Sequence, residues 1–579
     1  MATKVPAAAA ATPEALAAGS ISAADETDGE KRPASSQQAM MTTGKEADSS
    51  SSDGVPLEHT VTEKDPHYLS GLPLFAIIGS VTLVVFLMML DTSILATAIP
   101  RITDEFHSLQ DVGWYGSAYQ LASAALQPLT GKIYSKFSIK WCFLVFFGLF
   151  ELGSLLCGVA TSSTMLIVGR AVAGMGSSGL MNGGMTIVAN VVPLQRRPSL
   201  TGFMMGFSQM GIITGPLVGG ALTEYSTWRW CFYLNLPIGA VVAVFLAMLN
   251  IPDHIEKPPA MSVLPNLHHE LDLLGFALFA PAAIQLLLAL QYGGNEYAWN
   301  SATVIGLFCG AGATFLAWLA WDWHKGDNAL IPLRMIKKRA VWSGSSVQFT
   351  LMSTMFTAAY FMPIYFQAIK GVSPSMSGVY LLPSILTQLI FGVGSGVLVE
   401  RTGYIVPYSL VGGALVSISS GLFSLFNADT TAGQWIGYQI LNGAGRGCAL
   451  QMQSIAIQTT LTPAEISIAL AFLMFAQMLG AAITLVIANT IFNQSLRSEL
   501  TTQAPNVNPA LVIEAGATGF RSVVGEQDLP GVLLAYANSV SRVWYLATAM
   551  AALAFFFAFF MPWTDLRKKK KAAAGAEQA

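Results

Sequence analysis

Gly206-Phe-Ser-Gln-Met-Gly-Ile-Ile-Thr-Gly-Pro-Leu-Val-Gly-Gly220 is an uncharged stretch inside a long apolar run that begins near Leu200. Gly211, Gly215 and Gly219 recur every four residues, so on a helix they form one smooth stripe where a neighbouring backbone can approach closely. Pro216 lies within the stripe and removes a backbone donor, which bends the helix or leaves it bendable. The stretch predicts a membrane helix with one closely packed face, and ordinary packing is the simplest reading of that face.

The composition excludes a soluble protein. The chain has 579 residues, of which 53% are hydrophobic and only 11% are charged, whereas soluble domains carry about 25% charged residues. That much apolar surface requires a lipid bilayer as partner. The net charge of −3 gives no sign of a nucleic-acid partner. The five cysteines are scattered without metal-ligand spacing, so we expect neither a metal site nor a cofactor.

The chain divides into a polar tail and a series of apolar runs. Residues 1–70 lack a sustained apolar run and are expected to form a disordered cytoplasmic tail without a cleavable signal peptide. Runs of about 20 residues, each long enough to cross a bilayer, then follow one another. The sequence therefore predicts an all-α polytopic membrane protein with fourteen transmembrane helices. They lie near 72–98, 112–131, 141–160, 164–191, 200–222, 230–250, 273–292, 301–323, 341–368, 376–399, 404–426, 433–457, 466–492 and 541–562.

Loop charges set the orientation. With both termini in the cytoplasm, seventeen Lys and Arg residues of the loops and the C-terminal run fall inside and six fall outside, as expected from the excess of basic residues in cytoplasmic loops. This orientation makes 564–579 a basic cytoplasmic tail and 494–540 an external loop. A weak glycosylation sequon begins at Asn493, at the edge of that loop.

Three stretches recur in the same order along the chain. They pair Gln209 with Gln477, Gly131 with Gly396, and Arg170 with Arg446, at offsets of 268, 265 and 276 residues. A six-helix half needs only about 180–200 residues, so the offsets leave room for two extra spans. We expect an N-terminal half at 71–250, a linker with two extra helices at 251–338 and a C-terminal half at 339–563.

Ionisable residues inside apolar spans are expensive and are functional candidates by default. Three stand out as candidates for proton coupling: Asp91, Glu151 and Arg170. A carboxyl buried in a medium of low dielectric constant can take up and release a proton near neutral pH, although Asp91 also fits a wetted structural site near the end of its span. Arg170 stays charged and needs a carboxylate, a carbonyl or water nearby.

Several polar residues are candidates for lining a cavity. They are Gln209, Gln348, Arg446, Gln451 and Gln477. For each glutamine, a hydrogen bond between helices is an equally good explanation.

Several of these stretches resemble one known family. Gly206, Gly211, Gly215, Pro216, Gly219 and Gly220 match the GxxxGPxxGG antiporter motif of the fifth helix in drug:proton antiporters of the major facilitator superfamily. Leu90–Pro100 resembles the LDxTIVNVALP signature of the fourteen-span antiporters, Ile167–Gly176 resembles RxxxGxG, and Thr227–Gly239 resembles WRWxFxINxPxG. The resemblance covers residues 72–563 and is strongest to the fungal branch that exports toxins and secondary metabolites. It implies two six-helix halves plus two inserted helices, and a proton-transfer role for Arg170.

The loop after the second span resembles the cytoplasmic gating motif GxLxDRxGRR of the same superfamily. Gly131, Lys136 and Lys140 match, but Ser135 stands where an acid is expected and Ser138 where a glycine is. The usual charge lock is therefore in doubt here, while Glu400 and Arg401 keep an acid–base pair in the second half.

The resemblance implies a proton-coupled efflux pump for small hydrophobic organic compounds, working by alternating access as a monomer in the plasma membrane. A vacuolar location stays open, and a siderophore or other small-nutrient transporter on the same fold is the alternative. A membrane enzyme or sensor would need a catalytic cluster, and the sequence contains no Walker loop, zinc-ligand spacing or nucleophile elbow.

The corresponding stretch of the second half, Leu479–Thr484, lacks the proline and the glycine stripe of Gly211–Pro216. We therefore expect the stripe to form a tight seam between the halves that limits proton leak.

Overall fold

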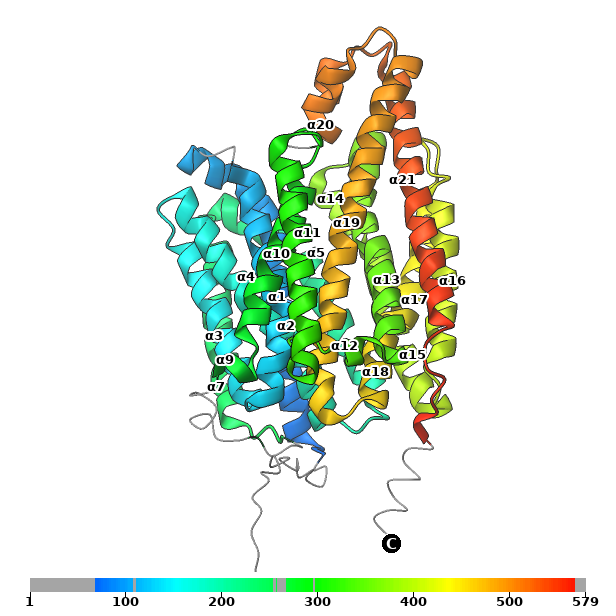
Figure 1. Ribbon diagram of the computed structural model, residues 1–579. Coiled ribbons are helices and arrows are strands. Elements are labelled where there is room, and N and C mark those ends of the chain that lie inside the picture. The colour runs from blue at the N-terminus through cyan, green and yellow to red at the C-terminus, as the bar shows by residue number, and fades with distance from the viewer. Residues whose placement is uncertain (1–67, 108–110, 254–256, 258–266, 295–296, 568–579) are drawn as a thin grey trace, which may run out of the picture. The chain divides into compact units, whose positions relative to one another are not determined.

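The computed structural model describes residues 68–107, 111–253, 257, 267–294 and 297–567, and these are almost entirely helical (Figure 1). The expected tail at 1–70 lies outside the described residues up to residue 67, and the basic tail at 564–579 lies outside them from residue 568 onward. We call the end of the bundle at which α1 begins the inner end and the opposite end the outer end, after the orientation expected from the loop charges.

The first half of the chain folds as long helices joined by short turns. Its elements are α1 (Leu72–Phe106), α2 (Val112–Lys136), α3 (Ile139–Gly158), α4 (Ser163–Val191), α5 (Arg197–Tyr225), α6 (Trp230–Tyr233) and α7 (Asn235–Met248).

A shorter helical segment separates the two halves. It consists of α9 (Leu267–Glu270), α10 (Leu273–Tyr292), α11 (Ala302–Lys325), the 3₁₀ turn η3 (Gly326–Asn328) and α12 (Leu333–Ile336).

The second half again consists of long helices. They are α13 (Arg339–Ile364), continued by the π-helical turn η4 (Tyr365–Ile369), then α14 (Pro374–Val379), α15 (Leu382–Thr402), α16 (Val406–Phe423), α17 (Ala432–Ala449), α18 (Met452–Thr460), α19 (Pro463–Gln503), α20 (Pro509–Val523) and α21 (Leu529–Ala558).

Local signals in the sequence account for several helix ends. The Ser162 and Ser301 side chains accept hydrogen bonds from backbone N–H groups in the first turns of α4 and α11, which satisfies donors that the helix itself leaves free. Thr462 and Glu465 form a reciprocal capping box at the start of α19. Gly403 ends α15 in the left-handed region, with φ 81°, a conformation that costs glycine little.

Each of the fourteen ranges expected to span the membrane contains a helix. In the described part of the chain, ten helical segments are long and apolar enough to cross a membrane. The helices α2, α4, α5 and α17 occupy the other four ranges and are less apolar. Many of their glycine, serine and amide residues pack against other helices; in α4, for example, Gly176, Ser177 and Asn182 are buried. Small and polar residues at helix contacts are usual in membrane bundles.

The glycine stripe of α5 packs against α1, which belongs to the same half of the chain. A Cβ atom at Gly211 would lie 2.7 Å from the carbonyl oxygen of Phe86, and one at Gly215 would collide with the Ser93 hydroxyl. That hydroxyl donates a hydrogen bond to the Gly211 carbonyl at 3.1 Å. The expectation that this stripe forms the seam between the halves is wrong, because its glycines face α1 and give the two backbones their close approach.

Other glycines do bring the two halves together. A Cβ atom at Gly202 or Gly206 on α5 would collide with Gly392 or Leu389 on α15, and one at Gly396 would lie 2.5 Å from the Ser199 backbone. On the other side of the bundle, a Cβ atom at Gly131 of α2 would lie 2.8 Å from the Ile468 Cα atom of α19. All of these contacts lie in the inner part of the bundle, so the two halves are closed against each other there.

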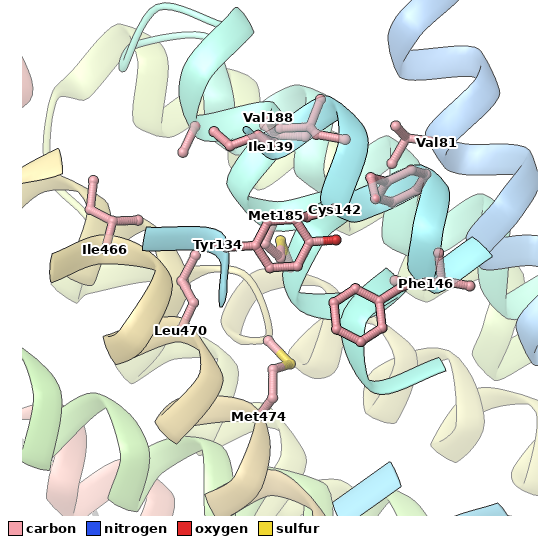
Figure 2. Close-up of a cluster of buried hydrophobic side chains, with 14 of the residues drawn as sticks. Val81, Tyr134, Ile139, Cys142, Phe146, Met185, Val188, Ile466, Leu470 and Met474 are labelled. Atoms are coloured by element: carbon pink, nitrogen blue, oxygen red, sulfur yellow. The ribbon is translucent and has the colours of Figure 1, made fainter. Parts of the chain in front are cut away.

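A shared hydrophobic core seals the inner end. Figure 2 shows Tyr134 of α2 among apolar side chains of the first half, with Ile466, Leu470 and Met474 of α19 on the other side. Tyr134 is buried and its hydroxyl donates a hydrogen bond to the Gly179 carbonyl oxygen at 3.0 Å. The closure at the inner end therefore combines backbone contacts at glycines with buried apolar area.

The segment at 494–540 is largely helical. Helix α19 continues to Gln503, α20 follows, and α21 begins at Leu529, twelve residues before the expected span at 541–562. Glu499 joins the two long helices, because it accepts hydrogen bonds from Arg542 at 2.6 Å and from Asn538 at 2.8 Å.

Replacing Gly215 with Leu should destabilise the protein, because the larger side chain would separate α1 from α5. Overpacking of a close contact typically costs about 1–3 kcal/mol. Thermal unfolding of the purified protein measures the effect. Gly148→Leu is the matched control, because a Cβ atom there meets nothing within 4 Å. Equal unfolding temperatures for the two variants would contradict the packing described for α1 and α5.

A charged pair at the outer end ties α1 to the start of α6. Glu105 accepts hydrogen bonds from the guanidinium of Arg229 at 2.9 and 3.1 Å and from Trp228 Nε1 at 2.7 Å. The hydrogen bond from Arg229, followed by that from Trp228, lowers the pKa of Glu105 below its usual value.

Because the pKa of Glu105 is lower in the folded state, the pair should stabilise the protein above the unfolded-state pKa of about 4.3. This contribution should be lost as the pH falls through the folded-state pKa. Glu105→Gln should lower stability at pH 7 by about 1 kcal/mol or less, since the pair is partly exposed, and the difference from wild type should shrink as the solution is made acidic. Thermal unfolding at a series of pH values below 7 measures it, with exposed Glu224→Gln as control. A difference that does not decrease with falling pH would contradict this.

Candidate functional site

A large cavity lies in the outer part of the bundle, between the two halves. It has a volume of about 790 Å³, within the range of about 300–1,000 Å³ that is typical of small-molecule sites. The first half contributes α1, α2 and α4, the second half contributes α13 and α19, and α10 of the middle segment supplies a further part of the wall.

The cavity wall is mainly apolar and carries neutral polar groups. Gln120, Gln291 and Asn489 are examples of these groups, among leucines, isoleucines and glycines. Of the lining residues, Arg170 alone is charged. The wall therefore suits an apolar molecule with a few hydrogen-bonding groups.

Arg170 meets Asp91 at the cavity wall, so two of the three candidates for proton coupling lie together. The Asp91 and Arg170 side chains form an ion pair at 2.6 Å and are 0% and 1% exposed. Arg170 Nε also donates a hydrogen bond to the Tyr115 carbonyl oxygen at 2.9 Å, and the guanidinium lies 4.6 Å from the ring centre of Tyr119. Because a buried guanidinium keeps its charge, this carboxylate and these contacts are what make its burial possible.

Glu151, the third candidate, lies close to this pair on α3. Its carboxylate rests against Gly239 of α7, and neither of its oxygens accepts a hydrogen bond within the described part of the chain. It is near enough to Asp91 for the charge of one acid to act on the other.

Asn235 of α7 is a hydrogen-bond partner of Asp91 that the sequence did not predict. Its amide donates hydrogen bonds to Asp91 at 3.3 Å and to the Ser154 hydroxyl at 3.1 Å. It lies one helical turn from Gly239, so one face of α7 meets both carboxyl groups. The available signal was a single amide in the otherwise apolar run at 230–248. Nothing in the sequence indicated that Tyr115 and Tyr119 contact Arg170, because tyrosines are common in membrane helices.

A second, smaller cavity of about 90 Å³ lies between the halves toward the inner end. Seven methionines line it, together with all four glutamines expected to face a cavity: Gln209, Gln348, Gln451 and Gln477. Gln348 Nε2 donates a hydrogen bond to Gln477 Oε1 at 2.9 Å, so this pair also fits the structural explanation.

Arg446 does not line either cavity. It is 7% exposed and donates a hydrogen bond to the Ser384 hydroxyl, while its Nε atom has no partner within the described residues. Its counterpart Arg170 has a carboxylate at 2.6 Å, whereas the partner given for Arg446 is a hydroxyl group.

The gating loop is held by α9 of the middle segment and by α7 of its own half. Lys136 forms an ion pair with Glu270 of α9 at 2.5 Å, and Lys140 donates a hydrogen bond to the Ala247 carbonyl oxygen at 2.6 Å. In the second half, Glu400 lies 4.0 Å from Arg196 of the first half, and Arg401 is exposed in the last turn of α15. The charges at this end therefore link separate segments of the chain.

The remaining site predictions concern modification and metal binding. Asn493 lies within helix α19 and lines the outer cavity. Its glycosylation stays a prediction. In the described part of the chain, no group of three His, Cys, Asp or Glu side chains could hold a metal ion.

A bundle with membrane-crossing helices, an apolar cavity between two halves and a buried ion pair at its wall defines a multi-pass membrane transporter. The sequence pattern of the Major Facilitator Superfamily matches residues 81–485, and the chain belongs to this superfamily.

Named relatives point in the same direction. The MFS-type transporter pigP of Monascus ruber is 58% identical over 86% of this chain and 88% of its own length. The efflux pump mlcE of Penicillium citrinum is 48% identical over 89% of this chain and 95% of its own length. The structure of the proton:xylose symporter XylE, 14% identical, matches 86% of this chain and 98% of its own with a TM-score of 0.55, which shows the fold. The chain is thus a transporter closely related to fungal efflux pumps, and not an enzyme.

Replacing Arg170 with Gln should strongly destabilise the protein, because Asp91 would keep a buried charge without its partner. Breaking a buried ion pair in this way typically costs about 3–5 kcal/mol. The double variant Asp91→Asn, Arg170→Gln should recover part of the loss, since neither charge remains. Thermal unfolding of the two single variants and the double variant measures this coupling, and strictly additive losses would contradict it.

Proposed function

We propose that the protein is a proton-coupled antiporter that exports small, largely apolar organic compounds across the plasma membrane by alternating access. The observation that carries the proposal is a cavity of about 790 Å³ in the outer part of the bundle with an ion pair at its wall, above an inner end where the halves are closed. Its named relatives include an efflux pump. The same proposal includes fourteen spans, arranged as two halves at 71–250 and 339–563 with a two-helix linker at 251–338. It also includes a monomeric state.

The chemistry of the walls supports apolar cargo. The inner cavity is lined by methionines, whose flexible thioethers adapt to differently shaped apolar surfaces, and by neutral glutamines. The single charged side chain at the outer cavity, Arg170, is paired with Asp91. A cargo with a strong net charge would meet no free opposite charge among the lining residues.

The closed inner end supports alternating access. The inner cavity is too small, at about 90 Å³, for a molecule of drug size. Cargo entering from the cytoplasm therefore requires the contacts between α5 and α15 and between α2 and α19 to separate. Once cargo occupies the space between the halves, closure at the inner end and opening at the outer end release it.

The ion pair provides a site at which a proton can shift the equilibrium between the state that is closed at the inner end and the state that is open there. A proton that enters the outer cavity and binds Asp91 turns the carboxylate into a neutral carboxyl and removes its attraction for Arg170. Arg170 then keeps its charge at the cavity wall, held by the Tyr115 carbonyl and the Tyr119 ring. Because the pair joins α1 to α4, its loss alters the contacts between two helices that line the cavity.

Glu151 is the second acid in this scheme. Its carboxyl group is buried and has no hydrogen-bond partner within the described residues, and an unpaired charge is costly in such a place. We assign it the role of holding a proton when Asp91 is ionised, so that one proton is shared between two acids beside a single arginine. Release of this proton to the cytoplasm, when the inner end opens, returns the pump to its starting state.

Everted membrane vesicles with an acidic lumen test this proposal. Nile red, a neutral apolar dye, should accumulate in vesicles that contain the wild-type protein, and collapse of the pH gradient should abolish the accumulation. Asp91→Asn and Glu151→Gln should each reduce gradient-driven uptake about 100-fold or more, the effect typical of losing a proton-transfer group. Asp429→Asn, at an exposed position, is the control. Uptake that ignores the gradient, or that survives both substitutions, would contradict proton coupling.

A further inference from the structure

The two helices of the middle segment bring their own residues to the outer cavity. Helix α10 packs against both α2 and α19, the helices that meet at one side of the bundle. Leu287, Leu290 and Gln291 of α10 line the cavity. A molecule in this cavity therefore lies against the middle segment as well as against the two halves.

The turn that follows α10 holds an indole ring at the cavity wall. Gly293 and Tyr297 form a β-bridge, and Gly294, with φ 76°, donates its N–H to the Tyr297 carbonyl oxygen at 2.8 Å. A Cβ atom at Gly294 would lie 2.6 Å from Nε1 of Trp299, and one at Gly293 would also collide with the indole. Two glycines in succession thus make room for one tryptophan.

Trp299 is held in place but not covered. Its ring stacks on Phe308 of α11, with the ring centres 6.5 Å apart and the planes at 21°. It lines the cavity and keeps 40% of its surface exposed. The part of an aromatic ring that stays exposed at a cavity wall is a contact surface for a second flat ring.

We propose that Trp299 is a specificity-determining cargo contact, which favours flat, conjugated, uncharged molecules over saturated molecules of similar size. The inference rests on the proposed function and adds the substrate class. Gln291 and Asn493 line the same cavity and supply hydrogen-bonding groups for a hydroxyl or carbonyl on such a molecule. The middle segment then selects cargo, in addition to filling the space beside α2 and α19.

A tryptophan at this end of a membrane helix has another explanation, because tryptophans anchor helices at the membrane interface. Loss of an anchor would impair insertion and stability of the protein and would weaken the binding of every cargo to the same extent. A cargo contact would change the preference between two cargos and leave insertion intact. The test must therefore compare two related compounds on the same protein.

Protection of a cysteine makes this comparison directly. Leu290→Cys, combined with Cys309→Ser to remove the exposed native thiol, places a reactive group on the α10 wall of the cavity. Intact cells are treated with a membrane-impermeant maleimide, with increasing concentrations of 2-anthracenemethanol or of its perhydro analogue. Thr502→Cys, at an exposed position at the end of α19, controls for effects of the compounds on labelling itself.

The flat alcohol should slow labelling of Leu290→Cys at about three- to tenfold lower concentration than the saturated alcohol, as expected for one aromatic stacking contact. Trp299→Leu should reduce this preference below about twofold, and Trp299→Phe should keep part of it. Trp230→Leu, which removes another exposed tryptophan from the outer end, should keep the full preference. Labelling of Thr502→Cys should not respond to either compound.

The inference is overturned if neither alcohol protects the cysteine, if both protect equally, or if the preference survives in Trp299→Leu. Surface amount and unfolding temperature of each variant show whether a loss of protection reflects misfolding, and Trp299→Phe keeps the test decisive if Trp299→Leu fails to fold. Because labelling needs no pH gradient, its failure is separate from failure of the vesicle experiment. Gradient-driven uptake of Nile red without protection at Leu290→Cys would reject this inference alone.

Discussion

The buried ion pair between Asp91 and Arg170 is the interaction on which the arrangement of the outer cavity depends. A guanidinium cannot lose its proton at any physiological pH, so its place inside the bundle requires a carboxylate within reach. That requirement fixes α1 beside α4, and the Asn235 hydrogen bond to Asp91 brings in α7. Since Arg170 also lines the cavity, the group that organises three helices is at the same time part of the cavity wall.

Close backbone contacts position the helix that carries Asp91. The glycine stripe of α5 brings α1 within contact distance, and Ser93, two residues after Asp91, donates its hydroxyl hydrogen to the Gly211 carbonyl. The antiporter motif therefore acts on the ion pair through the position of α1. The contacts between the halves come from Gly202, from Gly206 at the start of the same motif, and from Gly396, which lie nearer the inner end of their helices. The position of the ion pair and the closure of the inner end thus depend on different glycines.

Sequence alone predicted the helical ranges because each apolar run has the length of a bilayer crossing, and it predicted Asp91, Glu151 and Arg170 because charge is conspicuous in such runs. It could not predict that Arg170 pairs with Asp91 rather than Glu151. Both acids lie in apolar spans and are equally conspicuous in the sequence, and only the three-dimensional structure shows which of them is close to Arg170. Asn235 was missed because an uncharged amide is weakly marked. The sequence did not predict that α19 extends to Gln503 or that α21 begins as early as Leu529. Charged residues in these stretches, such as Glu499 and Arg542, are typical of an external loop.

The two sides of the bundle on which the halves meet differ from each other. Along α5 and α15 the helices touch at glycines. Along α2 and α19 they touch at Gly131 near the inner end, and the outer cavity lies between them farther out. Helix α10 packs on both of these helices and lines that cavity, so it forms part of the wall there. Its two ends have different tasks: Leu287, Leu290 and Gln291 face the outer cavity, whereas Phe279 and Ala283 belong to the hydrophobic core that seals the inner end. A change in the outer part of α10 therefore alters the cavity wall without touching the ion pair or the inner closure.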